Sequence, residues 1–142
     1  SINLMGARLR STLKRCDPPL PNSIRLIAVK VVKEGIVWGL RGYGEIYPGM
    51  TKIAKWGSCS ERQARRNVRV LEDWGLMTVV SHGKGGRKST RYRVEPEQII
   101  RVAMSRHANP HTELIAEIRD LRADMWEDIP PGHMAGHLSA GS

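Results

Sequence analysis

The sequence contains no phenylalanine, only two cysteines and no run of apolar residues as long as the roughly 18 that a membrane-spanning helix needs. We therefore expect no membrane span. Cys16 and Cys59 are too few for a disulfide framework, so both are expected as thiols. The basic N-terminal stretch lacks the apolar segment and the small-residue cleavage site of a signal peptide, which predicts a cytoplasmic protein. Without phenylalanine or an RNP-like segment, an aromatic platform for RNA bases is disfavoured.

Patterns of catalysis and of metal or nucleotide binding are also missing. The loop GKGGRKS (83–89) does not have the spacing of a phosphate-binding loop, and a strand rather than a helix is expected to follow it. Two histidine pairs have a spacing that zinc ligands can use: His107 with His111, and His133 with His137. Pro110 interrupts the first pair, the second lies in a glycine-rich tail, and no cysteine pair accompanies either. We expect no enzymatic activity, no cofactor and no metal site.

Positive charge is concentrated in the middle of the chain. The formal net charge of the 142 residues is +9. Residues 51–93 hold eleven basic and three acidic side chains, a surplus of eight, whereas residues 112–129 hold six acidic side chains and two arginines. This clustering predicts a polyanionic partner for the middle of the chain.

Two short helices and a hairpin are predicted within this basic region. MTKIAKWG (50–57) reads as a helix ending at Gly57, a residue suited to a left-handed position. After the turn SCS, Ser60 is a good N-cap and Gln63 completes a capping-box pattern. This second helix should stop at Gly75, and LMTVVS and RYRVE should form strands around a basic, glycine-rich tip.

Four arginines lie on one face of the predicted second helix. At about 100° per residue, its mostly apolar stripe is suited to docking on the first helix, and the arginines point away from that stripe or lie on its flank. The stripe consists of Ala64, Asn67, Val68 and Leu71, and the arginines are Arg62, Arg65, Arg66 and Arg69. Because like charges at this spacing repel one another, the arrangement favours a helix that meets an external anion.

The stretch from Tyr47 to Val94 resembles the winged-helix domain of many bacterial, phage and plasmid replication proteins and related regulators. The matching residues are Pro48, Ile53, Ala54, Gly57, Ser60, Val68, Leu71, Glu72, Gly75, Leu76, Gly85, Gly86 and Tyr92. The sequence departs from the pattern at Gly49, where a serine cap is usual, at Ala64 and at Asn67. The resemblance covers about a third of the chain and implies a mainly helical fold with a small β-hairpin wing: a winged helix–turn–helix plus a C-terminal helix.

The resemblance also implies a set of DNA-binding residues. The recognition helix would place Ser60, Glu61, Arg62, Arg65, Arg66 and Arg69 in or along the major groove, with Arg62 and Arg66 as the leading base readers. Phosphate or minor-groove contacts would come from Lys52, Lys55, Lys84, Arg87 and Lys88. Trp74 and Tyr92 are expected to pack in the core rather than to stack on bases.

Four segments are expected along the chain. They are a basic N-terminal extension (1–22), the winged helix–turn–helix domain (23–106), a linker with an acidic amphipathic helix (107–129) and a tail expected to be disordered (130–142). Within the domain, a helix capped by Ser23 is predicted over 23–35, a short strand near 45–47 and a helix with Pro96 in its first turn. The acidic helix has an apolar stripe, Leu114, Ile118, Leu121 and Met125, which favours a homodimer or a protein partner, with docking on its own domain as the alternative.

The sequence therefore predicts a sequence-specific binder of double-stranded DNA that acts as a transcriptional regulator. A phage or plasmid replication initiator that binds an origin is one alternative. The other is an interaction adaptor that binds protein through its winged helix and its acidic C-terminal helix. The target sequence, and the choice between activation and repression, are open at this point.

Overall fold

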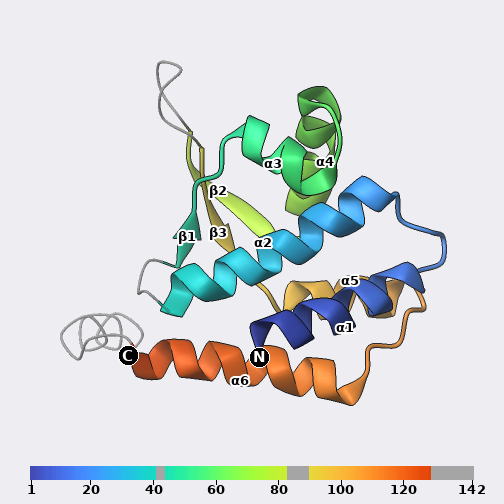
Figure 1. Ribbon diagram of the computed structural model, residues 1–142, viewed down its shortest axis with the longest axis vertical. Coiled ribbons are helices and arrows are strands. Elements are labelled where there is room, and N and C mark those ends of the chain that lie inside the picture. Colours follow the sequence, from blue (N-terminus) through green and yellow to red (C-terminus); the bar gives the residue numbers. More distant parts are fainter. Residues whose placement is uncertain (41–43, 83–89, 129–142) are drawn as a thin grey trace.

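The computed structural model describes residues 1–40, 44–82 and 90–128 (Figure 1). Its helices are α1 (Ile2–Lys14), α2 (Asn22–Leu40), α3 (Met50–Gly57), α4 (Glu61–Asp73), α5 (Gln98–Ser105) and α6 (Thr112–Asp128). Its strands are β1 (Glu45–Ile46), β2 (Met77–Ser81) and β3 (Arg91–Val94). None of the described helices is long and apolar enough to cross a membrane.

The three strands form one antiparallel sheet with the order β1-β3-β2. Glu45 pairs with Arg93 across β1 and β3, and Met77 pairs with Val94 across β2 and β3. Along β3 the side chains alternate between exposed and buried, as a strand with one face on the core requires. The prediction of a mainly helical protein with a small β-hairpin is confirmed, and so is the short strand predicted near residues 45–47.

Helix α2 is the centre of the fold. In Figure 1 it lies between α3 and α4 on one side and α1 and α6 on the other. Ile27, Val31 and Val32 are fully buried along it. The predicted helix over 23–35 is too short, because α2 begins at Asn22 and continues to Leu40. Gly35 does not end it; a Cβ there would lie 2.6 Å from Val94 Cγ1, so glycine lets the helix pass close to β3.

The N-terminal segment belongs to the same core. Its helix α1 is capped by Ser1, whose hydroxyl accepts a hydrogen bond from the Leu4 backbone N–H at 3.2 Å. Met5, Leu9 and Leu13 recur along one face of α1 and are fully buried. The segment predicted as a basic extension therefore contributes a full layer of packing beside α2 and α6.

Helix α6 docks on its own chain. Leu114 and Ile118, two of the four residues assigned to a partner surface, are fully buried in the core. That assignment is wrong for these two residues, because α1 and α2 already cover them, and the alternative of docking within the chain applies. Leu121 is partly buried against the same core, and the Met125 side chain lies outside the described part of the structure.

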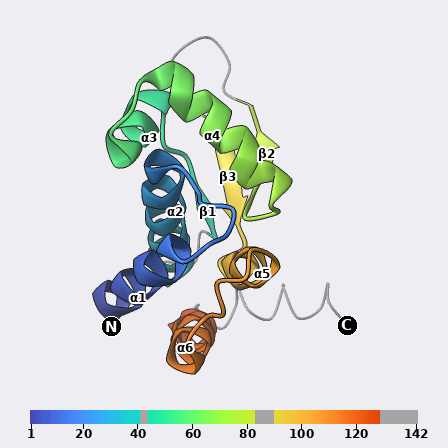
Figure 2. The same cartoon turned by 90° about the vertical axis from the view of Figure 1, so that its right-hand side faces the viewer.

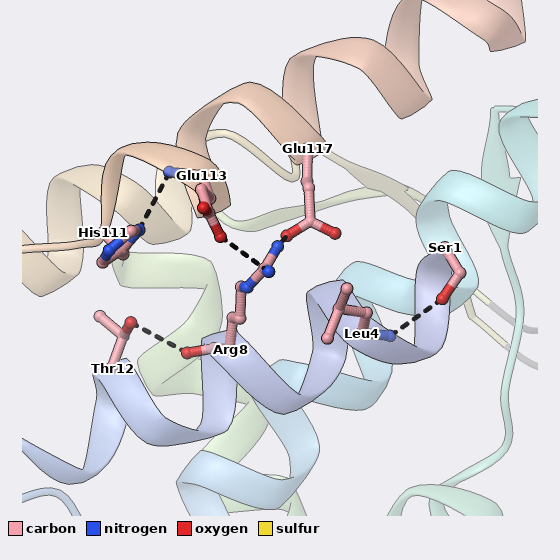
Figure 3. A network of polar contacts seen from close by, with 7 residues as sticks. All are labelled: Ser1, Leu4, Arg8, Thr12, His111, Glu113 and Glu117. Atoms are coloured by element: carbon pink, nitrogen blue, oxygen red, sulfur yellow. Dashed lines mark hydrogen bonds and ion pairs between the residues drawn. The ribbon is translucent and has the colours of Figure 1, made fainter.

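A cluster of charged side chains joins α6 to α1 (Figure 3). Arg8 on α1 pairs with Glu113 at 2.7 Å and also with Glu117, both on α6. The backbone N–H of Glu113 donates to His111 Nδ1 at 3.2 Å, which satisfies one of the free N–H groups at the start of α6. Acidic residues that could have faced a partner are thus used within the chain.

Helix α5 begins later than the sequence suggests. Pro96 and Glu97 form a turn, and the helix starts at Gln98. Just before this turn, Glu95 donates its backbone N–H to the Leu76 carbonyl at 2.8 Å, beside the start of β2. The linker predicted from residue 107 is present between the end of α5 at Ser105 and the start of α6 at Thr112.

Candidate nucleic-acid interface

Helices α3 and α4 form a compact two-helix unit joined by a tight turn. The left-handed position at the end of α3 is Ser58, with φ 50° and ψ 47°, and not Gly57 as predicted. Gly57 is the last helical residue, and a Cβ there would lie 2.8 Å from Ile27 Cδ1. Glycine is therefore needed at this position for the close approach of α3 to α2, while the turn itself is made by serine.

The start of α4 is capped as predicted, but the capping box is incomplete. The Ser60 hydroxyl accepts a hydrogen bond from the Gln63 backbone N–H at 3.1 Å. The Gln63 side chain does not return to Ser60; its Nε2 donates to Asn67 Oδ1 at 2.9 Å. One half of the expected box is present, and the glutamine amide is used one turn further along the helix. At the start of α3, Gly49 provides no side-chain cap, as its lack of a side chain predicts.

The packing stripe of α4 is the one predicted from the helical period. Its buried residues are Ala64, Asn67, Val68 and Leu71. On α3, Ile53 and Ala54 are buried in the same core. Helix α4 ends at Asp73, and Gly75 then takes a φ of 75°, so the predicted stop is also confirmed.

The four arginines of α4 are exposed: Arg62, Arg66 and Arg69 point away from this stripe, and Arg65 lies on its flank. Arg65 approaches Glu61 at 3.9 Å, one turn earlier on the same helix. Within the described residues, Arg62, Arg66 and Arg69 form no ion pair. An exposed pair such as Arg65–Glu61 stabilises the fold by less than about 1 kcal/mol. Since the other three arginines have no ion-pair partner in the described residues, the positive charge of this face is almost uncompensated. Lys52 and Lys55 are exposed on α3.

The structural role of Asn67 was not predicted from the sequence. This residue is 1% exposed, and its Nδ2 donates to Ser23 Oγ on α2 at 2.9 Å. Ser23 was predicted to cap α2, but the helix begins one residue earlier and the hydroxyl holds Asn67 instead. A buried amide with both ends hydrogen-bonded fixes α4 against α2 without leaving an unsatisfied polar group. Its place in an otherwise apolar stripe was the signal that could have identified it.

Aromatic side chains near the site serve mainly in packing. Tyr92 is buried in the core, and burial, with Glu72 nearby, raises the pKa of its phenol above the usual value. Trp74 packs partly against the core, with the Arg106 guanidinium 5.9 Å from its ring centroid. Packing roles were predicted for both. Trp56 is half-buried and lines a pocket of about 110 Å³ beside Tyr47.

The wing residues of the prediction lie outside the described residues. Lys84, Arg87 and Lys88 fall between β2 and β3 in the stretch 83–89, so the structure gives no position for them. Glu61 is exposed at the first position of α4, where its carboxylate suits the helix N-terminus. The described part of the site is therefore the exposed face of α4 together with the two lysines of α3.

The acidic helix is remote from this face. Figure 2 shows α3 and α4 at one end of the molecule and α6 at the other, with α2 between them. A search against models of protein families, curated proteins and solved structures gives no significant match to this chain.

Proposed function

We propose that the protein binds double-stranded DNA sequence-specifically through a winged helix–turn–helix, with α4 as the recognition helix. The observation that carries this proposal is the exposed arginine face of α4. Arg62, Arg66 and Arg69 project from the side opposite the buried stripe, and no carboxylate in the described chain pairs with them. A duplex supplies phosphates and guanine edges to such a face at the separations that arginine side chains span.

The order of the elements supports the same proposal. Two helices joined by a tight turn are followed by two antiparallel strands, and the sheet adds β1 on the far side of β3. This is the order of a winged helix. Under the proposal, the stretch 83–89 between the strands is the wing, and its Lys84, Arg87 and Lys88 contact phosphate or the minor groove.

Each part of the face has a distinct proposed role. Arg62 and Arg66 lie in the first turns of α4, which enter the groove most deeply, and they read base edges. Arg65 and Arg69 lie further round or further along the helix and contact the phosphate backbone, as do Lys52 and Lys55 on α3. The biological role that we propose is transcriptional regulation. Initiation of replication at a phage or plasmid origin is the alternative, because the same contacts would serve it.

The regulator and the replication initiator would make the same contacts with DNA and would differ in where on the genome they bind. A protein-binding adaptor would instead use α6 as a partner surface, but Leu114 and Ile118 are buried within the chain. Duplex binding therefore remains the function that the exposed groups favour. Mapping of occupied sites across the host genome would then decide the role: promoters for a regulator, one origin-like cluster for an initiator.

The proposal is tested by measuring duplex binding of the whole chain at several salt concentrations. We expect selection of a consensus site from a random duplex library, and an affinity that falls steeply with salt, with a slope of about −0.9 per phosphate contact. The double variant Arg62→Ala/Arg66→Ala should lose the preference for that site. Its matched control is Arg101→Ala/Arg119→Ala, which removes the same charge from exposed positions on α5 and α6 and should retain the preference. Equal affinity of the unaltered protein for consensus and random duplex would overturn the proposal.

A further inference from the structure

We propose that Gln63 is a specificity-determining residue that reads an adenine in the target duplex, and that the buried Asn67 orients its amide for this purpose. The inference rests on the proposed function, since it assigns one further contact to the same helix face. It concerns a residue that the sequence pattern placed in a helix cap rather than in the site.

The geometry is a relay of three side chains from two helices. Gln63 Nε2 lies 2.9 Å from Asn67 Oδ1, and Asn67 Nδ2 lies 2.9 Å from Ser23 Oγ. Asn67 is 1% exposed, so neither of its amide atoms can turn to water. The Gln63 amide is bonded to Asn67, and Asn67 is bonded in turn to Ser23 on α2. The Gln63 side chain itself remains partly exposed.

Gln63 also lies at the correct place on the helix. At about 100° per residue, it falls about 60° from Arg66 round the axis, between the arginine face and the buried stripe. It is in the first turn of α4, next to the N-cap Ser60, and the first turns of a recognition helix reach base edges. An amide at this border can contact the groove floor while its inner edge remains bonded to Asn67.

The chemistry of the remaining donors and acceptors selects the base. After one N–H is donated to Asn67, the Gln63 amide retains a second N–H and its Oε1 acceptor. Adenine presents an acceptor at N7 and a donor at N6 in the major groove, which matches this pair, whereas guanine presents two acceptors. If the relay runs in the opposite sense, from the Ser23 hydroxyl outward, Gln63 retains both N–H groups and one lone pair on Oε1. In either sense its amide keeps one acceptor and one donor that can pair with adenine.

Orientation by Asn67 also has an energetic consequence. A free glutamine on a helix surface loses rotamer freedom when it binds, which opposes binding. Gln63 is already restrained by its bond to a buried partner, so less freedom is lost on binding. Removing that partner should weaken discrimination at one base pair without changing the phosphate contacts.

The experiment measures relative affinities for every single-base-pair change of the selected site, using the whole chain. We expect Gln63→Ala to reduce the preference for one A·T pair from about tenfold or more to nearly none, with the salt slope unchanged. Ser23→Ala should lower the preference at the same base pair several-fold, and Ser23→Thr, which retains a hydroxyl, should restore it. Gln98→Ala is the control, because Gln98 is the chain's other glutamine and lies on α5. Circular dichroism and melting establish that each variant is folded.

The outcomes separate this inference from the function on which it rests. If the unaltered protein prefers a site and Gln63→Ala retains every preference, the inference is overturned and the proposed function stands. A loss located at a G·C pair overturns the assignment of adenine. An unaltered protein with no sequence preference overturns both. Equal effects of Ser23→Ala at all positions would show that Asn67 acts on the fold as a whole and not on Gln63.

Discussion

A Cβ added to Gly35 would lie 2.6 Å from Cγ1 of Val94, so α2 passes β3 at a separation that only glycine permits. This contact connects the central helix with the middle strand of the sheet. Because Val94 is buried in a packed core, the position of the hairpin relative to α2 depends on the absence of a side chain at residue 35.

We predict that Gly35→Ala destabilises the protein by about 1–3 kcal/mol, because the added methyl group overpacks the core. Chemical denaturation measures the change in the free energy of unfolding. Gly6→Ala on α1 is the matched control, since the nearest neighbours of its Cβ, from 3.0 Å, are atoms of the flexible Lys33 side chain. Alanine also favours the helix over glycine, so this variant should show little change or a small gain. Equal destabilisation by both substitutions would contradict the prediction.

The turn between α3 and α4 gives a second prediction with opposite signs at adjacent residues. Ser58→Gly should stabilise the protein by about 0.5–1 kcal/mol, because glycine adopts the left-handed conformation of residue 58 without steric cost. Gly57→Ala should destabilise it, because its Cβ would meet Ile27 at 2.8 Å. Thermal melting of the two variants against the unaltered protein measures both effects. A destabilised Ser58→Gly would mean that residue 58 is not left-handed.

The contact between α1 and α6 is open to a charge test. Arg8→Ala should destabilise the protein by about 1 kcal/mol, since it leaves Glu113 and Glu117 close together without a counter-charge. The loss should shrink as salt is added, because ions screen partly exposed charges. Arg119→Ala removes an exposed arginine of α6 and serves as the control. Urea unfolding at low and high ionic strength measures both effects. Equal loss of stability in Arg8→Ala and Arg119→Ala would contradict the prediction.

Because Tyr92 is buried, we predict that the stability of the protein depends on pH in the alkaline range. Burial, followed in size by the charge of Glu72, raises the pKa of Tyr92 above the usual 10.0, although a hydrogen bond with Thr90 opposes this. The unfolded chain therefore loses this proton at lower pH than the folded protein does. The stabilisation is complete below about pH 10 and is lost as the pH rises through the folded pKa, at no more than about 1.4 kcal/mol per pH unit. Between neutral and alkaline pH, the unfolding free energy of the unaltered protein should fall relative to that of Tyr92→Phe, which has no phenol proton to lose. A constant difference would refute the assignment.

Much of helix α4 could be predicted from the sequence. The 3.6-residue period separates the packing stripe of α4 from its arginines, and Ser60 and Gly75 mark where the helix starts and stops. These features depend on neighbours within a few residues, so a single sequence carries the information. The same holds for the alternation in β3 and for the apolar face of α1.

Other features depend on segments that are distant along the chain. The period of α6 reveals an apolar stripe, but only the packed structure shows that α1 and α2 cover Leu114 and Ile118. A glycine in the sequence suggests the end of a helix, yet Gly35 lies within α2. Both Gly35 and Gly57 leave room for a residue of another element, Val94 and Ile27 respectively. Such steric limits arise only when separate elements pack together.

The location of the positive charge, the face of α4 that carries it and the strands that follow can all be predicted from the sequence alone. The bonds from Gln63 to Asn67 and from Asn67 to Ser23, and the place of the acidic α6 at the far end of the molecule, are visible only in the folded chain. The reason is that helical and strand periods are local properties of a chain. Hydrogen-bond partners and covered faces are set by which helices pack against α2.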